Sequence, residues 1–243
     1  MARPAVRRAP RYREAAERLA EQIGSGELEP HTRLPSERTI AGEFGLSRMT
    51  ARQAVEYLVR RGLVYRRPGS GTYVSAPRIV HTLQRLAGFS EQMRAQGIEP
   101  SGRVLEVTLA DHLDPDAADA LQLDRRDRAW TMKRIRYGDG EPLLLETFVV
   151  PDAVCPQLGR FDLSGGSLYD LMRREFRVEP ARAHESIEPT ACDAGDARHL
   201  GARPGAPAIL VTRVTYDRAG RPVEYARDLY RGDRARFRSE EVV

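Results

Sequence analysis

Apolar residues in the first third of the chain recur every three or four positions, the spacing of an amphipathic helix. The first stripe runs from Tyr12 to Ile23 and is ended by a Gly-Ser-Gly sequence. A second, shorter stripe follows Ser36, a residue type that caps helix N-termini, and it stops at Gly45. We therefore expect a support helix followed by a short capped helix.

A third stripe begins after Ser47, which offers another N-cap, with Thr50 at the third helical position. Its apolar face consists of Ala51, Ala54, Val55 and Leu58. Arg48 lies in the first exposed turn, and Arg52, four residues on, shares its flank. A capped helix, a tight turn and an exposed, arginine-bearing helix start are typical of a helix-turn-helix that enters a DNA major groove.

Residues 64–74 alternate modestly and turn at a Pro-Gly-Ser-Gly sequence that contains Gly69, so we expect a β-hairpin, or wing. Its glycines let the backbone approach a phosphate, and Arg66 and Arg67 add positive charge beside it. A phosphate-cradling nucleotide loop is the alternative interpretation. The motif lacks the P-loop lysine, and no helix is indicated directly after it.

Beyond residue 83 the pattern changes to a short amphipathic helix and then to segments with strand character. We place strands at 103–109, 129–137, 143–150, 181–189, 207–216 and 222–230. Helices are expected at 115–122, 167–176 and 192–200. The predicted class is α+β, with an N-terminal winged helix-turn-helix domain and a C-terminal antiparallel sheet covered by helices. The predicted divisions are a flexible arm (1–10), the winged domain (11–76), a linker (77–82) and the second domain (83–243).

Charge separates the two halves. Residues 1–77 contain 14 arginines and 8 glutamates, a net charge of +6, whereas the remainder carries 25 basic and 27 acidic residues. A basic N-terminal third suits a polyanionic partner there, although a solvated arginine-rich surface would give the same count. With 41% hydrophobic residues, the chain can bury a core.

Other chemistries find little support in the sequence. Cys155 and Cys192 have neither the number nor the spacing of a metal site, and the five histidines form no ligand pair, so we expect no metal and no cofactor. The basic start has no apolar core of a signal peptide, and no stretch reaches about 18 uninterrupted apolar residues. We therefore expect a reduced, cytoplasmic protein that does not bind membranes.

Four motifs in the N-terminal third occur in a fixed order: Leu34-Pro35-Ser36-Glu37-Arg38, Ser47-Arg48-Met49-Thr50-Ala51-Arg52-Gln53-Ala54, Gly62-Leu63-Val64 and Gly69-Ser70-Gly71-Thr72-Tyr73-Val74. This series resembles the winged helix-turn-helix of GntR-family bacterial transcription regulators. The resemblance implies that Arg38, Arg48 and Arg52 contact operator DNA, and Ser47, Thr50 and Gly69 match further contact positions. Arginine forks can bond to the O6 and N7 atoms of guanine. For Arg52, the alternative is a surface ion pair with Glu56 at helical spacing.

The second half resembles the UTRA effector-binding domain, which marks the HutC-like branch of this family and shares the chorismate lyase fold. The motifs that carry the resemblance are Phe89-Ser90-Glu91-Gln92-Met93, Arg134-Ile135-Arg136, Asp139-Gly140-x-Pro142, Glu146 before Pro151, Ser167-Leu168-Tyr169, Pro222-Val223-Glu224-Tyr225 and Tyr230-Arg231-Gly232-Asp233. In members that bind phosphorylated amino sugars, matching positions hold the ligand, and Tyr230 matches one of them.

Arg134 and Arg136 alternate and therefore share one face of their strand. With the hydroxyls of Ser90, Ser167 and Tyr169 they could clamp a phosphate or carboxylate. Glu146 would hold a hydroxyl or an amine on the far side of the ligand. The alternative is a cross-strand ion pair between Arg134 and Glu146 on a wet sheet face.

Hairpin geometry tests this pocket. A two-residue turn at Asp139-Gly140 would pair Arg134 with Leu145 and put Glu146 on the opposite face. A three-residue turn with Gly140 in the left-handed region pairs Met132 with Glu146 and places both arginines on the glutamate's face. The pocket hypothesis thus predicts an odd-length turn, and a two-residue turn counts against it.

The sequence therefore predicts a transcription regulator, most often a repressor in this family, and not an enzyme. We expect a homodimer on a palindromic DNA operator, with a small effector such as a phosphorylated sugar or a carboxylate in the second domain. Two alternatives stay open. One is a lyase-fold enzyme with a basic appendage, and the other is a constitutive architectural DNA-binding protein whose second domain only dimerises.

Overall fold

The computed structural model describes residues 10–75, 78–83 and 86–240, and it divides the chain into two units, Met1–Pro77 and Arg78–Val243. Most of the predicted N-terminal arm, residues 1–9, lies outside the described residues. The same holds for residue 77, at the start of the predicted linker. Each unit has its own hydrophobic core and is described separately below.

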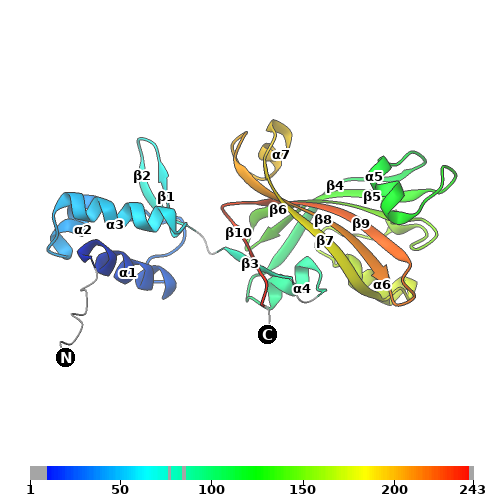
Figure 1. The fold of residues 1–243 in the computed structure, drawn as a ribbon, viewed down its shortest axis with the longest axis horizontal. Helices are drawn as coiled ribbons and strands as arrows, with labels where there is room; N and C mark the ends of the chain where they lie inside the picture. Colours follow the sequence, from blue (N-terminus) through cyan, green and yellow to red (C-terminus); the bar gives the residue numbers. More distant parts are fainter. Residues whose placement is uncertain (1–9, 76–77, 84–85, 241–243) are drawn as a thin grey trace, which may run out of the picture. The chain divides into compact units, whose positions relative to one another are not determined.

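In the N-terminal unit, helices α1 (Arg11–Gly24), α2 (Glu37–Glu43) and α3 (Arg48–Arg60) precede the hairpin of strands β1 (Val64–Arg67) and β2 (Gly71–Val74) (Figure 1). Their core is made of the predicted stripes and includes Leu19, Ile40, Ala51, Ala54 and Leu58. The sequence therefore predicted this winged helix-turn-helix element by element.

Both predicted N-caps are formed. The Ser36 hydroxyl accepts from the Thr39 amide, and the Ser47 hydroxyl accepts from the Thr50 amide, each at 3.1 Å. These bonds satisfy amide groups that have no partner within the helix. Gly45, with φ of 59°, lets the chain turn from α2 into α3.

The C-terminal unit is built on a six-stranded antiparallel sheet in the order β4-β5-β6-β9-β8-β7. Its strands, all six expected from the sequence, are β4 (Pro100–Ala110), β5 (Ala129–Gly138), β6 (Glu141–Pro151), β7 (Pro180–Ala191), β8 (Pro207–Asp217) and β9 (Pro222–Arg231). Helices α5 (Pro115–Leu121) and α7 (Ala194–His199) pack on one face of this sheet. The other face is covered by α4 (Phe89–Arg94), α6 (Leu168–Phe176) and the 3-10 helix η1 (Leu158–Arg160).

The first strand of this unit was not predicted. Residues 79–82, expected in a linker, form strand β3 (Ile79–Thr82), which pairs in parallel with β10 (Ala235–Arg238). Ile79 and Ala235 are buried together with residues of the large sheet. The next helix, expected from residue 83, begins only at Phe89.

The turn between β5 and β6 differs from the expected one. Gly138 pairs with Glu141, so the turn has two residues, Asp139 and Gly140, both with positive φ. The predicted three-residue turn is therefore wrong. However, Arg136 pairs with Leu144 and Tyr137 with Pro142, which leaves Leu143 as an extra residue in β6.

This bulge restores the side-chain parity that the turn alone would have broken. Glu146 lies directly opposite Arg134, not opposite Met132, and both arginines are on its face of the sheet. The shared face was predicted correctly, although the structural device that produces it was not.

Candidate functional site

The six residues expected to contact DNA all belong to the helix-turn-helix and its wing. Arg38 on α2 and Arg48 and Arg52 on α3 are exposed, as is Gly69, which has a φ of 74° in the hairpin loop. Ser47 and Thr50 are occupied with each other, because their hydroxyl oxygens lie 2.8 Å apart at the start of α3. The geometry thus gives this pair a capping role in addition to any contact with DNA.

The alternative interpretation of Arg52 is also realised. Its Nε atom donates to Glu56 at 3.1 Å, and the two side chains are 53% and 38% exposed. Arg66 of the wing approaches the same carboxylate at 3.8 Å. Ion pairs this exposed stabilise a fold by less than about 1 kcal/mol, so they do not prevent these arginines from turning to a phosphate or a base.

In the C-terminal unit, the seven residues predicted for the effector line a single cavity: Ser90, Arg134, Arg136, Glu146, Ser167, Tyr169 and Tyr230. Four come from the sheet strands β5, β6 and β9, whereas the other three come from α4 and from the start of α6. The sheet therefore forms the floor of the cavity, and the two helices form its cover.

Arg134 is buried and firmly held. Its Nε atom donates to Glu146, and its Nη1 atom donates to the carbonyl oxygens of Leu163 and Gly166. Burial alone would raise the pKa of Glu146, but Arg134 and then Arg136 hold it below its ordinary value. The cross-strand ion pair between Arg134 and Glu146, which was the alternative interpretation, is present, but both residues are buried in the wall of the cavity and do not lie on a wet face.

Arg136 is in a different situation. It is fully buried, and within the described parts of the chain it forms no ion pair with a carboxylate. Nη2 donates to the Ser90 hydroxyl at 2.6 Å, Nη1 donates to the carbonyls of Ser164 and Gly166, and the group stacks on Phe89. Its Nε atom has no partner. Burial, and then the charge of Arg134, lowers the pKa of Arg136 to about 10, so it remains a cation at neutral pH.

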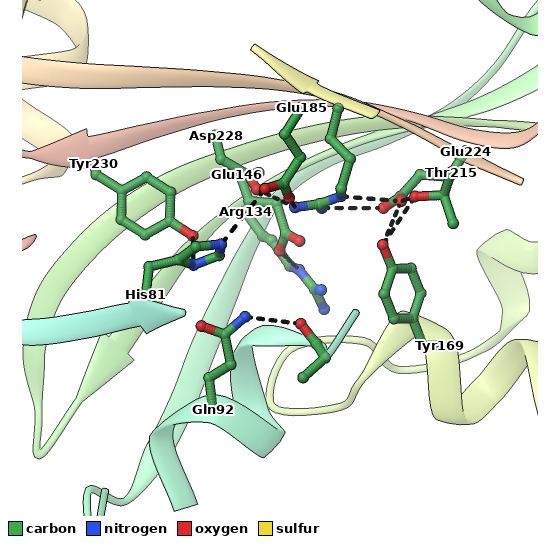
Figure 2. A network of polar contacts seen from close by, with 12 residues as sticks. His81, Gln92, Arg134, Glu146, Tyr169, Glu185, Thr215, Glu224, Asp228 and Tyr230 are labelled. Atoms are coloured by element: carbon green, nitrogen blue, oxygen red, sulfur yellow. Dashed lines mark hydrogen bonds and ion pairs between the residues drawn. The ribbon is translucent and has the colours of Figure 1, made fainter. Parts of the chain in front are cut away.

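The far side of the cavity is acidic and was missed by the sequence analysis (Figure 2). Arg213 on β8 contacts Asp228 at 3.0 Å, Glu224 at 3.4 Å and Glu185 at 3.6 Å. Glu224 also accepts from Thr215 at 2.6 Å. The strand pattern contained an indication of this, because Glu224 and Asp228 share the parity of Tyr230 and therefore its face of β9.

Tyr169 belongs to this acidic side. Its hydroxyl donates to Glu224 at 2.9 Å, and burial raises the pKa of the phenol well above its ordinary range. His81 on β3 completes the wall, with Nδ1 3.4 Å from the Tyr230 hydroxyl and Nε2 3.9 Å from Glu185. Burial, and then the charge of Arg213, lowers the pKa of His81 to about 4, so it is neutral at physiological pH.

The cavity itself is small, with a free volume of about 20 Å³, room for about one water molecule. A second cavity of about 420 Å³ adjoins it and shares His81, Gln92, Tyr169 and Arg213 as walls. It lies between β7 and the segment around Leu83 and Leu86. A small metabolite is larger than the inner space, so it would enter only if some of the side chains that line this space moved.

In the residues that the structure describes, no group of three or more His, Cys, Asp or Glu side chains could hold a metal ion. None of the described helices is both long and apolar enough to cross a membrane.

A winged helix-turn-helix joined to a domain with a small, charged cavity defines the class of ligand-responsive DNA-binding regulators. Two protein-family models match the chain, one in each unit. The model of "Bacterial regulatory proteins, gntR family" matches residues 11–74, and the model of the UTRA domain matches residues 95–236. The chain belongs to the GntR family of bacterial transcription regulators, in the HutC-like branch with a UTRA domain.

Its relatives include two named repressors. The HTH-type transcriptional repressor NagR of Bacillus subtilis is 37% identical over 228 residues, covering 94% of this chain and 93% of that protein. The mannosyl-D-glycerate transport/metabolism system repressor MngR of Escherichia coli is 32% identical over 230 residues, covering 94% of each chain. Among solved structures, PhnF from Mycobacterium smegmatis gives a TM-score of 0.69 at 29% identity, covering 94% of this chain and 99% of that one.

Proposed function

We propose that this regulator is a homodimeric repressor that binds a palindromic operator and releases it when a small anion enters the UTRA cavity. In the dimer, the two recognition helices α3 lie about 34 Å apart, one turn of DNA. Arg48 and Arg52 read bases, Arg38 and the wing at Gly69 hold the phosphate backbone, and Ser47 and Thr50 fix the start of α3. The protein acts in the cytoplasm, where the chromosome is.

The observation that carries the effector proposal is Arg136. A fully buried cation without a carboxylate partner is costly, and an anionic ligand would neutralise it. Ser90 contacts Arg136, and Ser167 lines the same cavity, so both hydroxyls can donate to a ligand; a phosphate or carboxylate would replace the carbonyl oxygens that Arg136 now contacts. A phosphorylated sugar or a carboxylate is the proposed effector class.

Release then requires that the effector bind the two arrangements of the dimer with different affinity. Strand β3 connects the pocket to the DNA-binding unit, because His81 lines the cavity and the strand begins just after the boundary at Arg78. A ligand that displaces His81 moves this strand. The names of the two relatives, both repressors, favour regulation over the lyase-fold enzyme alternative.

The DNA half of the proposal is tested by fluorescence anisotropy on the DNA upstream of the protein's own gene. Arg48→Ala and Arg52→Ala each weaken operator binding by about tenfold to a hundredfold, because a bidentate base contact contributes about 1–3 kcal/mol. Arg174→Ala is the matched control, since this arginine is 71% exposed and lies in the other unit. Wild-type affinity in both α3 variants would refute the assignment.

The effector half is tested with Arg136→Met. This variant should bind the operator like the wild type and fail to release it in a screen of sugar phosphates and small carboxylates that releases the wild type. Release of both proteins by the same compound would remove Arg136 from the effector site.

A further inference from the structure

One large apolar side chain of the N-terminal unit lies outside its core. Met49, the second residue of α3, is 64% exposed, the highest value for a large hydrophobic residue in the part of the chain that the structure describes. The buried stripe of α3, from Ala51 to Leu58, faces the other way and forms the core without Met49. Packing within this unit therefore does not account for an apolar residue at position 49.

The neighbours of Met49 on the helix surface are polar or positively charged. Arg48 precedes it, and Arg52 and Gln53 lie three and four positions further on, a spacing that brings side chains together on a helix. All three are exposed. Arg52 donates to Glu56, one turn further along, and leaves Met49 uncovered. Met49 is thus an apolar spot in a basic surface at the start of the recognition helix.

The chemistry of the major groove offers one partner for such a spot. The first residues of a recognition helix face the base edges. These edges carry hydrogen-bond donors and acceptors and a single apolar group, the C5-methyl of thymine, which apolar side chains contact. A methionine suits this contact, because its flexible and polarisable thioether adapts to the shape of its partner. A phosphate or a guanine edge offers no comparable apolar surface, so the side chain favours thymine.

We propose that Met49 is a specificity-determining residue that reads the C5-methyl group of one thymine in each half-site of the operator. Arg48 and Arg52 supply hydrogen bonds to bases, and Met49 distinguishes thymine from cytosine, which has no methyl group, by apolar contact. This inference rests on the proposed role of α3 as the recognition helix.

The experiment removes only the methyl group from the DNA. The operator is the duplex that the wild-type protein selects from a random-sequence pool, and each thymine of one half-site, together with its symmetry mate, is replaced by uracil in turn. Fluorescence anisotropy with the full-length protein should show a position at which uracil weakens binding at least fivefold, because each lost methyl contact is worth about fourfold and the dimer loses two. In Met49→Ala the same replacement should change the affinity less than twofold.

Two further variants serve as controls. Met49→Leu keeps an apolar side chain and should remain sensitive to the methyl group. Val107→Ala truncates an exposed apolar residue of the other unit, 37% exposed, and should behave like the wild type on both duplexes. Circular dichroism and thermal melting establish that each variant is folded.

The outcomes separate this role from the DNA-binding proposal itself. If no uracil replacement weakens binding of the wild type, or if the loss is the same in Met49→Ala, the role of Met49 is overturned, while reduced affinity in Arg48→Ala and Arg52→Ala still supports α3 as the recognition helix. If the wild type selects no duplex from the pool, both proposals are overturned.

Discussion

Arg134 on β5 lies directly opposite Glu146 on β6, and it does so only because Leu143 is an extra residue in β6. The two-residue turn before it would by itself place Glu146 on the other face of the sheet, away from both arginines. A single inserted residue thus decides whether the cavity has a carboxylate beside its cations. Leu143 is itself buried, so the insertion is anchored in the core.

Deletion of Leu143 should remove the bulge and abolish anion binding, because the strand beyond it would present the opposite set of side chains. Leu143→Ala keeps the register and should bind like the wild type, although it loses about 2–5 kcal/mol of stability. Calorimetry with a binding sugar phosphate and urea unfolding measure the two effects. Equal binding by both variants would show that the bulge does not set the site.

Arg134→Met and Arg136→Met should differ in stability although the substitution is the same. Loss of Arg134 leaves Glu146 buried and unpaired, which costs about 3–5 kcal/mol of unfolding free energy. Arg136 has no carboxylate partner in the described chain, and its loss leaves only neutral hydrogen-bond acceptors unsatisfied, so it should cost less, about 1–3 kcal/mol. Urea unfolding of the two variants without ligand makes the comparison, and equal destabilisation would contradict it.

Ser36 and Ser47 form a natural matched pair, because each accepts from the third amide of its helix at 3.1 Å. Ser36→Ala and Ser47→Ala should each lose about 1 kcal/mol of stability as their caps are removed. Only Ser47→Ala should also weaken operator binding, since it alone is expected at the DNA. If the two variants lose operator affinity to the same extent, Ser47 acts through the cap alone.

His81 should make the protein less stable in mild acid. Its pKa is about 4 in the folded state and about 6.5 in an unfolded chain, so the unfolded chain binds the proton first. Stability from this group is complete above pH about 6.5 and falls by roughly 3 kcal/mol as the pH decreases to about 4.

His81→Gln should remove this part of the pH dependence. Thermal melts of both proteins between pH 7.5 and 4.5 measure the difference, with the groups around His81, namely Tyr230, Glu185 and Arg213, left in place. Parallel curves for the two proteins would show that His81 does not titrate differently on folding.

Much of this molecule could be predicted from its sequence because local patterns and tertiary packing agree. The stripes of α1 and α3, the caps at Ser36 and Ser47, and all six strands of the large sheet follow from residue spacing. The seven residues predicted to bind the effector also line one cavity, since alternation on β5 and resemblance to a family point to the same face.

The remaining features depend on contacts between distant segments. Strands β3 and β10 have four residues each and are separated by more than 150 positions, so neither shows a period of its own. The bulge at Leu143 lies in a continuous run of buried leucines, and an extra leucine in such a run does not change the hydrophobic pattern of the sequence. Asp228 and Glu224 could have been found by parity with Tyr230, but only the structure shows that both carboxylates converge on Arg213.

The pairing of β3 with β10 also limits the length of the free chain that joins the DNA-binding unit to the second unit. Four residues of extended chain span about 13 Å, and while they are paired in the sheet they add nothing to the flexible linker of the DNA-binding unit. If β10 separated from β3, each winged unit of a dimer would gain that reach, a large fraction of the roughly 34 Å between half-sites. Strand β10 therefore limits the length of free chain between the two units. We expect that a protein shortened to remove β10 would tolerate a wider range of half-site spacings, although its effector cavity and its recognition helix are unchanged.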